Sequence, residues 1–335
     1  MPRIIDIMKR KMLVLGFALA LAPLIAGWLA ADQLAHPPRR PLQDFHNEFI
    51  ADPRAHGVIL RPFACSDGTP CLLCEPDAKA PPGRRGKLIR EQLAAKGVPL
   101  QTYGEIVGTL VLVHGRRGRK EDYLPIAERF CAAGFRCVIP DLPAHGDHPA
   151  KIAAYGVREG GLPEMVLHES AKRFSFDPEP SGIMGLSMGG AVSVQSCARE
   201  HAPWKAVVLV STFDALPNVV RHQSANLVGE WAGGLLAKIT GWMFRQATGF
   251  PLENADSKAA VPLIRCPVLM AHGMSDRVIP IALGRNLRDA LPAGITTDWI
   301  EIPDADHDDV LITDFPIYAK MAEWMLRHVA EPGRN

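Results

Sequence analysis

A G-x-S-x-G pentapeptide, Gly185 to Gly189, constrains the fold of this chain more than any other sequence feature. Residues 181–186 before it predict a short buried strand, and residues 188–200 after it predict a helix that begins with small side chains. A strand that turns sharply into a helix holds the central serine at the end of a sheet with its hydroxyl exposed. Glycine is expected on both sides because a Cβ there would clash with neighbouring backbone. The pentapeptide alone occurs in many unrelated chains, so its meaning depends on its surroundings.

Alternating strands and helices surround the pentapeptide. Residues 109–114 form a continuous apolar run, as expected for a strand that is covered on both faces. The other predicted strands are a hairpin at 57–64 and 71–75, followed by 135–140, 205–210, 267–270 and 297–302. The clearest helices are predicted at 87–96, 121–133 and 163–174. This order predicts an α/β domain over residues 56–330, with a mostly parallel central sheet and helices on both faces.

One connection, residues 211–261, is too long to be a plain crossover between two strands. It contains an amphipathic stretch with Trp231 and Trp242. Long insertions in compact domains are usually functional, so we expect a helical cap over about residues 212–260 that covers a pocket. The alternative is an extra pair of helices that packs on the edge of the sheet.

The serine of the pentapeptide needs partners, because a hydroxyl is a weak nucleophile unless a base takes its proton and an acid orients that base. The strand at 267–270 leads into a turn that carries Asp276, and the last strand leads into a loop that carries His307. We expect Ser187, Asp276 and His307 to meet at one edge of the sheet as nucleophile, acid and base. Their order along the chain is the order expected for G-x-S-x-G enzymes.

Acyl transfer also needs hydrogen-bond donors for the negative charge that develops on the carbonyl oxygen. We assign this role to the backbone N–H groups of Met188, directly after the serine, and of Arg116, in the loop after the 109–114 strand. Gly115 would let that loop approach closely, and His114 would brace it.

Several residues compete for these roles. The acid Asp276 has rivals beside His307 in the carboxylates at positions 304, 306, 308 and 309. The base has rivals in His145, His148 and His272. The cations at 116, 117, 119 and 120, beside the expected oxyanion loop, either attract an anionic substrate or form a solvated face.

Taken together, these motifs resemble the α/β-hydrolase superfamily over about residues 57–329. The resemblance rests on five motifs in a shared order, namely His114-Gly115, Asp141 to Gly146, Gly185 to Gly189, His272 to Asp276 and the His307 loop. It implies a Ser-His-Asp triad and no cofactor, in a branch shared by membrane-anchored serine hydrolases and prolyl-oligopeptidase-like enzymes. We therefore expect a carboxylesterase or lipase-like enzyme that acts on a small acyl substrate through an acyl-enzyme. A peptidase, a thioesterase and a non-catalytic, membrane-tethered binding protein are the alternatives.

The first 35 residues have a different character. Residues 12–31 carry no charged side chain and follow a basic start that contains Arg3 and Lys9 to Lys11. A run of about 20 apolar residues can span a bilayer as a helix. We expect residues 1–35 to be a signal anchor that holds the enzyme on the extracytoplasmic side of a membrane, followed by a linker over residues 36–55. A cleaved signal peptide, which would leave the protein secreted or periplasmic, and a buried helix are the alternatives.

Net charge and cysteine spacing argue against nucleic acid as a partner and against a metal site. The formal net charge of +1 and the lack of a basic stripe argue against nucleic acid as a partner. Cys71 and Cys74 have the spacing of a zinc ribbon but no second pair follows them, so we expect no metal site. In an oxidising compartment, Cys65 could form a disulfide with either of these two cysteines.

Overall fold

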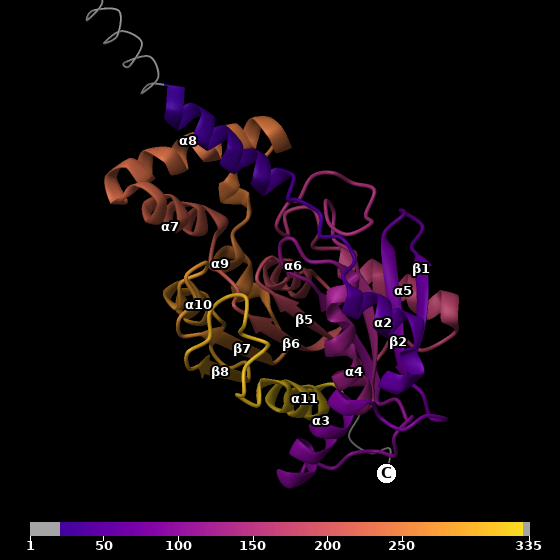
Figure 1. Ribbon diagram of the computed structural model, residues 1–335. Helices are drawn as coiled ribbons and strands as arrows, with labels where there is room; N and C mark the ends of the chain where they lie inside the picture. The colour runs from indigo at the N-terminus through magenta and orange to yellow at the C-terminus, as the bar shows by residue number, and fades with distance from the viewer. Residues whose placement is uncertain (1–20, 331–335) are drawn as a thin grey trace, which may run out of the picture.

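A single eight-stranded sheet runs through residues 21–330, the part of the chain that the computed structural model describes (Figure 1). Its strand order is β1-β2-β4-β3-β5-β6-β7-β8. The strands are β1 (Val58–Ala64), β2 (Pro70–Pro76), β3 (Gly108–Val113), β4 (Phe135–Pro140), β5 (Ser181–Leu186), β6 (Trp204–Val210), β7 (Val268–Gly273) and β8 (Thr297–Ile302). The pairs β1–β2 and β2–β4 are antiparallel, and all other neighbours are parallel. The prediction of an α/β domain with a mostly parallel central sheet is confirmed.

Helices cover both faces of this sheet. The α-helices are α2 (Asp44–Ala51), α3 (Arg84–Ala95), α4 (Leu124–Ala132), α5 (Leu162–Phe174), α6 (Met188–Cys197), α7 (Leu216–Val228), α8 (Glu230–Thr248), α9 (Ser257–Ala260), α10 (Ile281–Arg288) and α11 (Ile317–His328). Short 3-10 helices are η1 (Pro53–His56), η2 (Lys120–Tyr123), η3 (Leu252–Asn254) and η4 (Val261–Leu263).

Strand β3 shows why its sequence is apolar at every position. Leu110 and Leu112 belong to a core that contains residues of α3, α4 and α11. Val111 and Val113 belong to a second core, which contains residues of α5 and α6. Successive side chains of a strand point to opposite faces, so a central strand with helices on both sides buries all of them.

The connection from β6 to β7 contains α7 and α8, which lie beyond one end of the sheet (Figure 1). Phe244 of α8 is buried against Tyr155 and Phe250, with ring centroids 6.4 and 5.5 Å away. These contacts attach the helical pair to the body of the domain, at the position where the cap is expected.

Residues 36–55, expected to be a linker, are instead built into the domain and include α2 and η1. Helix α2 buries His46 and Phe49. The ring of Phe49 stacks on that of His56, with centroids 3.8 Å apart, and His46 Nε2 lies 2.9 Å from Asp122 Oδ1. Aromatic burial and a close polar contact between His46 and Asp122 therefore hold a segment whose proline-rich start suggests only a spacer.

The predicted signal anchor is described only in part, because residues 1–20 lie outside the described residues. Residues 21–35 form a helix that runs alongside α8 (Figure 1). The approach is close, since a Cβ on Gly27 would stand 2.5 Å from Ile239 Cγ2. Among the helices of residues 21–330, none combines the length and the apolar character needed to cross a bilayer.

Candidate active site

Ser187 lies on the sharp turn between β5 and α6 with φ 55° and ψ −117°. Its N–H donates a hydrogen bond to Val210 O at 2.8 Å. A Cβ on Gly185 would collide with the carbonyl of Gly189, and a Cβ on Gly189 would collide with the carbonyl of Val113. The two flanking glycines thus allow the backbone to pass close enough to hold the serine in a strained conformation.

The structure brings together the three side chains that the sequence assigns to one site. His307 Nε2 lies 3.1 Å from Ser187 Oγ, and His307 Nδ1 lies 2.8 Å from Asp276 Oδ2. The three residues follow β5, β7 and β8, whose carboxyl ends share one edge of the parallel sheet. One imidazole therefore contacts the hydroxyl through one nitrogen and the carboxylate through the other, the arrangement that a serine nucleophile requires.

The Asp276 carboxylate is fully buried and held by backbone. Its Oδ1 accepts hydrogen bonds from the N–H groups of Val278 at 3.0 Å and Ile279 at 2.7 Å, which leaves Oδ2 facing His307. His272 Nε2 donates to Ile279 O at 2.8 Å, and burial lowers the pKa of this histidine. His272 is consequently a neutral support for the acid-bearing turn, and the structure does not bring it to the serine as a base.

The rival carboxylates have other surroundings. Asp306 pairs with the Arg277 guanidinium, and backbone N–H groups of Arg277 and His307 lower the pKa of Asp306 to about 2. The other three, at positions 304, 308 and 309, are exposed. In the described chain, Asp276 is the carboxylate bonded to the His307 ring.

The loop after β3 lies against the nucleophile. A Cβ on Gly115 would stand 3.3 Å from Leu186 O and 3.5 Å from Ser187 Cβ. Met188 is the first residue of α6, and the first N–H groups of a helix have no partner within it. The backbone of Gly115 and that of Met188 thus lie next to Ser187, and the assignment of the Arg116 and Met188 N–H groups to an oxyanion hole stays a prediction.

A buried histidine fixes one peptide of this loop. His114 Nε2 accepts a hydrogen bond from the Leu142 N–H at 3.0 Å, so the proton of the neutral ring is on Nδ1, which donates to Gly115 O at 2.8 Å. Burial lowers the pKa of His114 to about 4 and keeps the ring neutral. Because the Gly115 carbonyl and the Arg116 N–H belong to one planar peptide, His114 also sets the direction of that N–H.

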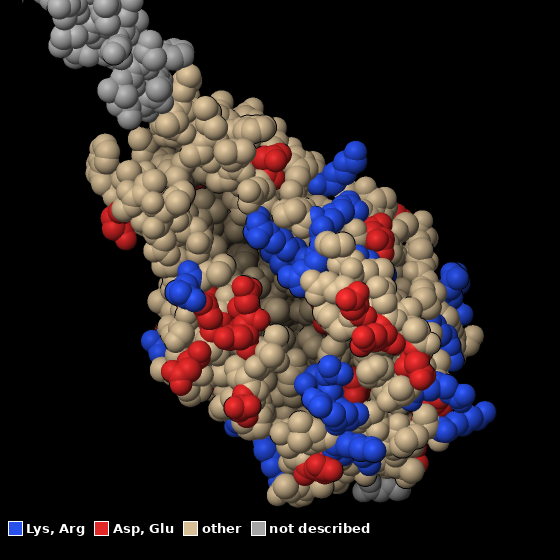
Figure 2. Space-filling view, viewed as in Figure 1, with Lys and Arg blue, Asp and Glu red and all other residues tan. Residues whose placement is uncertain are grey.

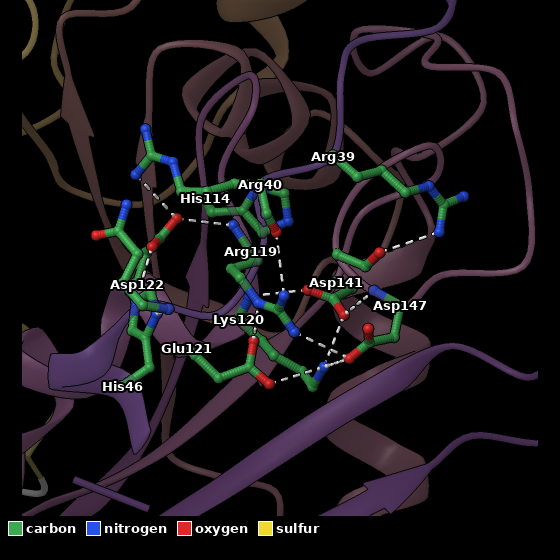
Figure 3. A network of polar contacts seen from close by, with 12 residues as sticks. Arg39, Arg40, His46, His114, Arg119, Lys120, Glu121, Asp122, Asp141 and Asp147 are labelled. Atoms are coloured by element: carbon green, nitrogen blue, oxygen red, sulfur yellow. Dashed lines mark hydrogen bonds and ion pairs between the residues drawn. The ribbon is translucent and has the colours of Figure 1, made fainter. Parts of the chain in front are cut away.

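A network of buried charges supports the same loop from behind (Figure 3). Asp141 accepts from Lys120 N at 2.7 Å, from Lys120 Nζ at 2.8 Å and from Asp147 N at 2.8 Å. Burial opposes the charge on Lys120, but Asp141, Asp147 and Glu121 outweigh it and raise the lysine pKa. Arg119 is also buried and paired with Glu121 at 2.6 Å. These two cations hold the loop and are not placed to attract an anionic substrate.

The remaining two cations of the run bind a segment that sequence reasoning missed. Arg116 Nη2 donates to Gln33 O at 2.7 Å, and Arg117 Nη2 donates to the Gln33 side chain at 3.3 Å. Tyr155 Oη donates to Leu34 O at 3.1 Å, and Ala153 N donates to Ala35 O at 2.9 Å. The end of the first described helix is therefore bonded to the loop after β3 and to residues 153–155. No short sequence motif predicts these contacts, because the residues that form them are more than 80 positions apart in the chain.

Metal ligands are not grouped at this site. In residues 21–330 no cluster of three His, Cys, Asp or Glu side chains has an arrangement that could hold a metal ion.

Comparison with known proteins relates this geometry to a family. Residues 110–317 match the alpha/beta hydrolase family. The pimeloyl-[acyl-carrier protein] methyl ester esterase of Chromobacterium violaceum is 25% identical over 251 residues, which cover 64% of this chain and 92% of that protein. The monoacylglycerol lipase of Mycolicibacterium smegmatis is 24% identical over 221 residues, 54% of this chain and 75% of that protein. A Pyrococcus furiosus esterase structure shares the fold, with a TM-score of 0.60 and 14% identity, covering 89% of this chain and 99% of that one.

Proposed function

The chain belongs to the α/β hydrolase family, and we propose that it is a serine hydrolase that cleaves carboxylic esters. One observation carries the proposal: the His307 ring lies between the Ser187 hydroxyl and the Asp276 carboxylate, within hydrogen-bonding distance of both. Related chains that are named as a methyl ester esterase and a monoacylglycerol lipase support an ester as the bond that is cleaved.

The first half-reaction forms an acyl-enzyme. His307 Nε2 takes the proton from Ser187 Oγ as that oxygen attacks the ester carbonyl carbon. The tetrahedral intermediate carries its negative charge on the former carbonyl oxygen, which accepts hydrogen bonds from the N–H groups of Met188 and Arg116. His307 then gives its proton to the leaving alkoxy oxygen, and the carbon–oxygen bond breaks to release the alcohol.

The second half-reaction uses the same groups. His307 takes a proton from water as the water oxygen attacks the acyl carbon, and returns a proton to Ser187 Oγ as the carboxylic acid leaves. The Asp276 carboxylate accepts the hydrogen bond from His307 Nδ1 and so holds the ring proton there, which leaves Nε2 free to accept. No cofactor is required for this cycle, since every proton moves between the substrate, water and the triad.

Replacement of the nucleophile tests the proposal. We expect Ser187→Ala to abolish p-nitrophenyl butyrate turnover and labelling by a fluorophosphonate probe, while circular dichroism and melting temperature change little. Ser193→Ala is a matched control, because its buried hydroxyl bonds to Gly189 O within the same helix and lies outside the triad. Turnover or labelling that persists in Ser187→Ala would show that another residue performs the reaction.

A substrate panel then tests the ester assignment. Esters, thioesters and peptide amides with the same acyl group should be compared by kcat/KM. A preference for the thioester would assign thioesterase activity to the chain, and a preference for the amide would assign peptidase activity. If the native chain shows neither turnover nor probe labelling, a binding protein is favoured.

We also propose that residues 12–31 anchor the chain in a membrane, with the basic residues before them on the cytoplasmic side. The support is the uncharged run and its basic flank. Retention in the membrane pellet after alkaline carbonate washing, with an intact N-terminus by mass spectrometry, is the expected result. An N-terminus near residue 31 would indicate a cleaved signal peptide instead.

A further inference from the structure

The first described helix presents an apolar stripe to the outside. Its exposed large side chains are Leu21, Leu24, Ile25, Trp28 and Leu29. These positions follow the i, i+3, i+4, i+7, i+8 spacing that lines one face of a helix. Residues 31 and 35 of the same helix are buried, and Gly27 contacts α8, so the stripe is the face that nothing in the described chain covers.

The neighbouring cap helices continue this apolar surface. Exposed side chains at the end of α7 and along α8 are Leu227, Val228, Trp231, Leu235 and Trp242. The two helices and the 21–35 helix form one end of the molecule (Figure 1), and Figure 2 shows that end largely free of charged side chains. We call these residues, together with the stripe, the apolar end. A contiguous apolar surface of this kind marks a site of interaction.

The chain that precedes residue 21 indicates what covers the apolar end. Residues 12–20 are uncharged and lead directly into the stripe, and Lys9 to Lys11 precede them. Together with residues 21–31 of the stripe-bearing helix they make one uncharged run, residues 12–31, which is long enough to enter a bilayer and has the basic flank typical of a membrane anchor. Because the stripe residues 21–29 belong to this run, insertion of the run brings the stripe to the membrane, and α7 and α8 lie beside it (Figure 1).

The residue types on the apolar end favour a lipid surface over a second protein copy. Three of the six tryptophans, Trp28, Trp231 and Trp242, are exposed there. Tryptophan is enriched where membrane meets water, because its ring is apolar and its N–H is polar. Lys238 is exposed between Leu235 and Trp242 along α8, and among residues 21–330 it forms no salt bridge with a carboxylate. A lysine can extend from a bilayer surface to lipid phosphates, whereas burial in a dry protein contact would leave its charge unpaired.

We propose that the apolar end rests on a lipid bilayer and that the cap thereby receives ester-linked lipids from the membrane; the second half of this statement rests on the proposed esterase function. The apolar end is attached to both sides of the site. Arg116 of the oxyanion loop bonds to Gln33 at the end of the stripe-bearing helix, and Gln223 of α7 donates to the carbonyls of Arg277 and Val278 beside the acid. Figure 2 shows a hollow in the surface directly below this tan end.

Fluorescence quenching tests the docking independently of catalysis. The full chain is reconstituted into phosphatidylcholine–phosphatidylglycerol vesicles with or without bromine on the acyl chains. In a Trp28→Phe, Trp242→Phe background, Trp231, which is 87% exposed, is the remaining tryptophan of the apolar end. Brominated lipid should quench its emission, and the added change Trp231→Phe should remove the quenched component. A matched control combines Trp231→Phe with Leu88→Trp on α3, and the new tryptophan should not be quenched.

Activity on two substrates tests lipid delivery. The cap variant combines Leu235→Ser with Trp231→Ser, and Leu88→Ser on α3 is its control, since Leu235 and Leu88 are 49% and 50% exposed. The cap variant should turn over a vesicle-borne monoacylglycerol about tenfold more slowly, the effect expected for the removal of one or two apolar contacts with lipid. Turnover of soluble p-nitrophenyl butyrate should stay unchanged, and Leu88→Ser should alter neither rate.

The outcomes separate the two proposals. Absence of quenching at Trp231 would overturn the docking. Cross-links between two copies of a Trp231→Cys variant would likewise overturn it and assign the apolar end to a protein contact. Equal loss of both activities in the cap variant would overturn lipid delivery. Quenching in a chain that hydrolyses no ester would retain the docking and refute the esterase.

Discussion

His114 donates a hydrogen bond from Nδ1 to the carbonyl oxygen of the next residue, Gly115, at 2.8 Å. The bond orients the peptide whose N–H belongs to Arg116. In the proposed oxyanion hole, a small rotation of that peptide would weaken the hydrogen bond to the transition state more than the hydrogen bond to the ground state.

We therefore predict that His114→Ala lowers kcat for p-nitrophenyl butyrate by about ten- to a hundredfold with little change in KM. This loss is smaller than the loss expected when an oxyanion donor itself is removed, because the Arg116 N–H is still present. His114→Asn, which can keep a donor near the Gly115 carbonyl, should recover part of the rate. The melting temperature of each variant shows how much folded protein is lost. If both variants lose the same kcat, and this loss parallels their loss of folded protein, His114 has a purely structural role.

Asp276 should be separable from its neighbours by substitution. Asp276→Asn keeps the size of the side chain but removes the charge that holds the proton on His307 Nδ1, and we expect kcat to fall by about a thousandfold or more. Asp306→Asn is the matched control in the adjacent loop, where loss of the Arg277 pair should change kcat by less than about tenfold. A larger effect of Asp306→Asn than of Asp276→Asn would reassign the acid.

Acid should destabilise the fold through buried histidines. Burial lowers the pKa of His114 to about 4, and burial together with His114 lowers that of His145 to about 3. The unfolded chain takes up these protons near pH 6.5, while the folded chain stays neutral, so stability is fully present above that pH and falls as the pH drops toward 4. His114 alone corresponds to a loss of about 3 kcal/mol over this interval. Urea titrations at pH 7.5 and pH 5 should show the decrease, and His145→Asn should reduce it; a pH-independent midpoint would contradict the assignment.

Two cysteines are placed to form a disulfide on oxidation. The Sγ atoms of Cys65 and Cys71 lie 3.8 Å apart, both as free thiols, whereas Cys74 faces Cys137 across β2 and β4. Burial raises the pKa of Cys71, so its thiolate is scarce and diamide should oxidise the pair slowly at neutral pH and faster in alkali. Peptide mapping should find a Cys65–Cys71 link. A Cys65–Cys74 link would require β2 to change register.

The local sequence was sufficient to predict the strand–turn–helix at Ser187, since glycine spacing and apolar runs act over a few residues. The same holds for the turns that carry Asp276 and His307, because parallel strands send their carboxyl ends to one edge. The choice of Asp276 over its four rivals was predicted from chain order, and the structure supplies its physical basis in the backbone N–H groups that hold its carboxylate.

Other features required the tertiary structure. Residues 36–55 looked like a spacer because the prolines at positions 37, 38 and 41 disfavour helices and strands locally, yet His46 and Phe49 find distant partners that hold them in the domain. The arginine and lysine run beside the oxyanion loop looked solvated, and only the fold shows Lys120 buried against Asp141. Short-range pattern thus predicted the elements and the order in which Ser187, Asp276 and His307 follow their strands. Burial, charge pairing and the contact between the first helix and the cap depend on residues far apart in the chain, and only the folded structure decides them.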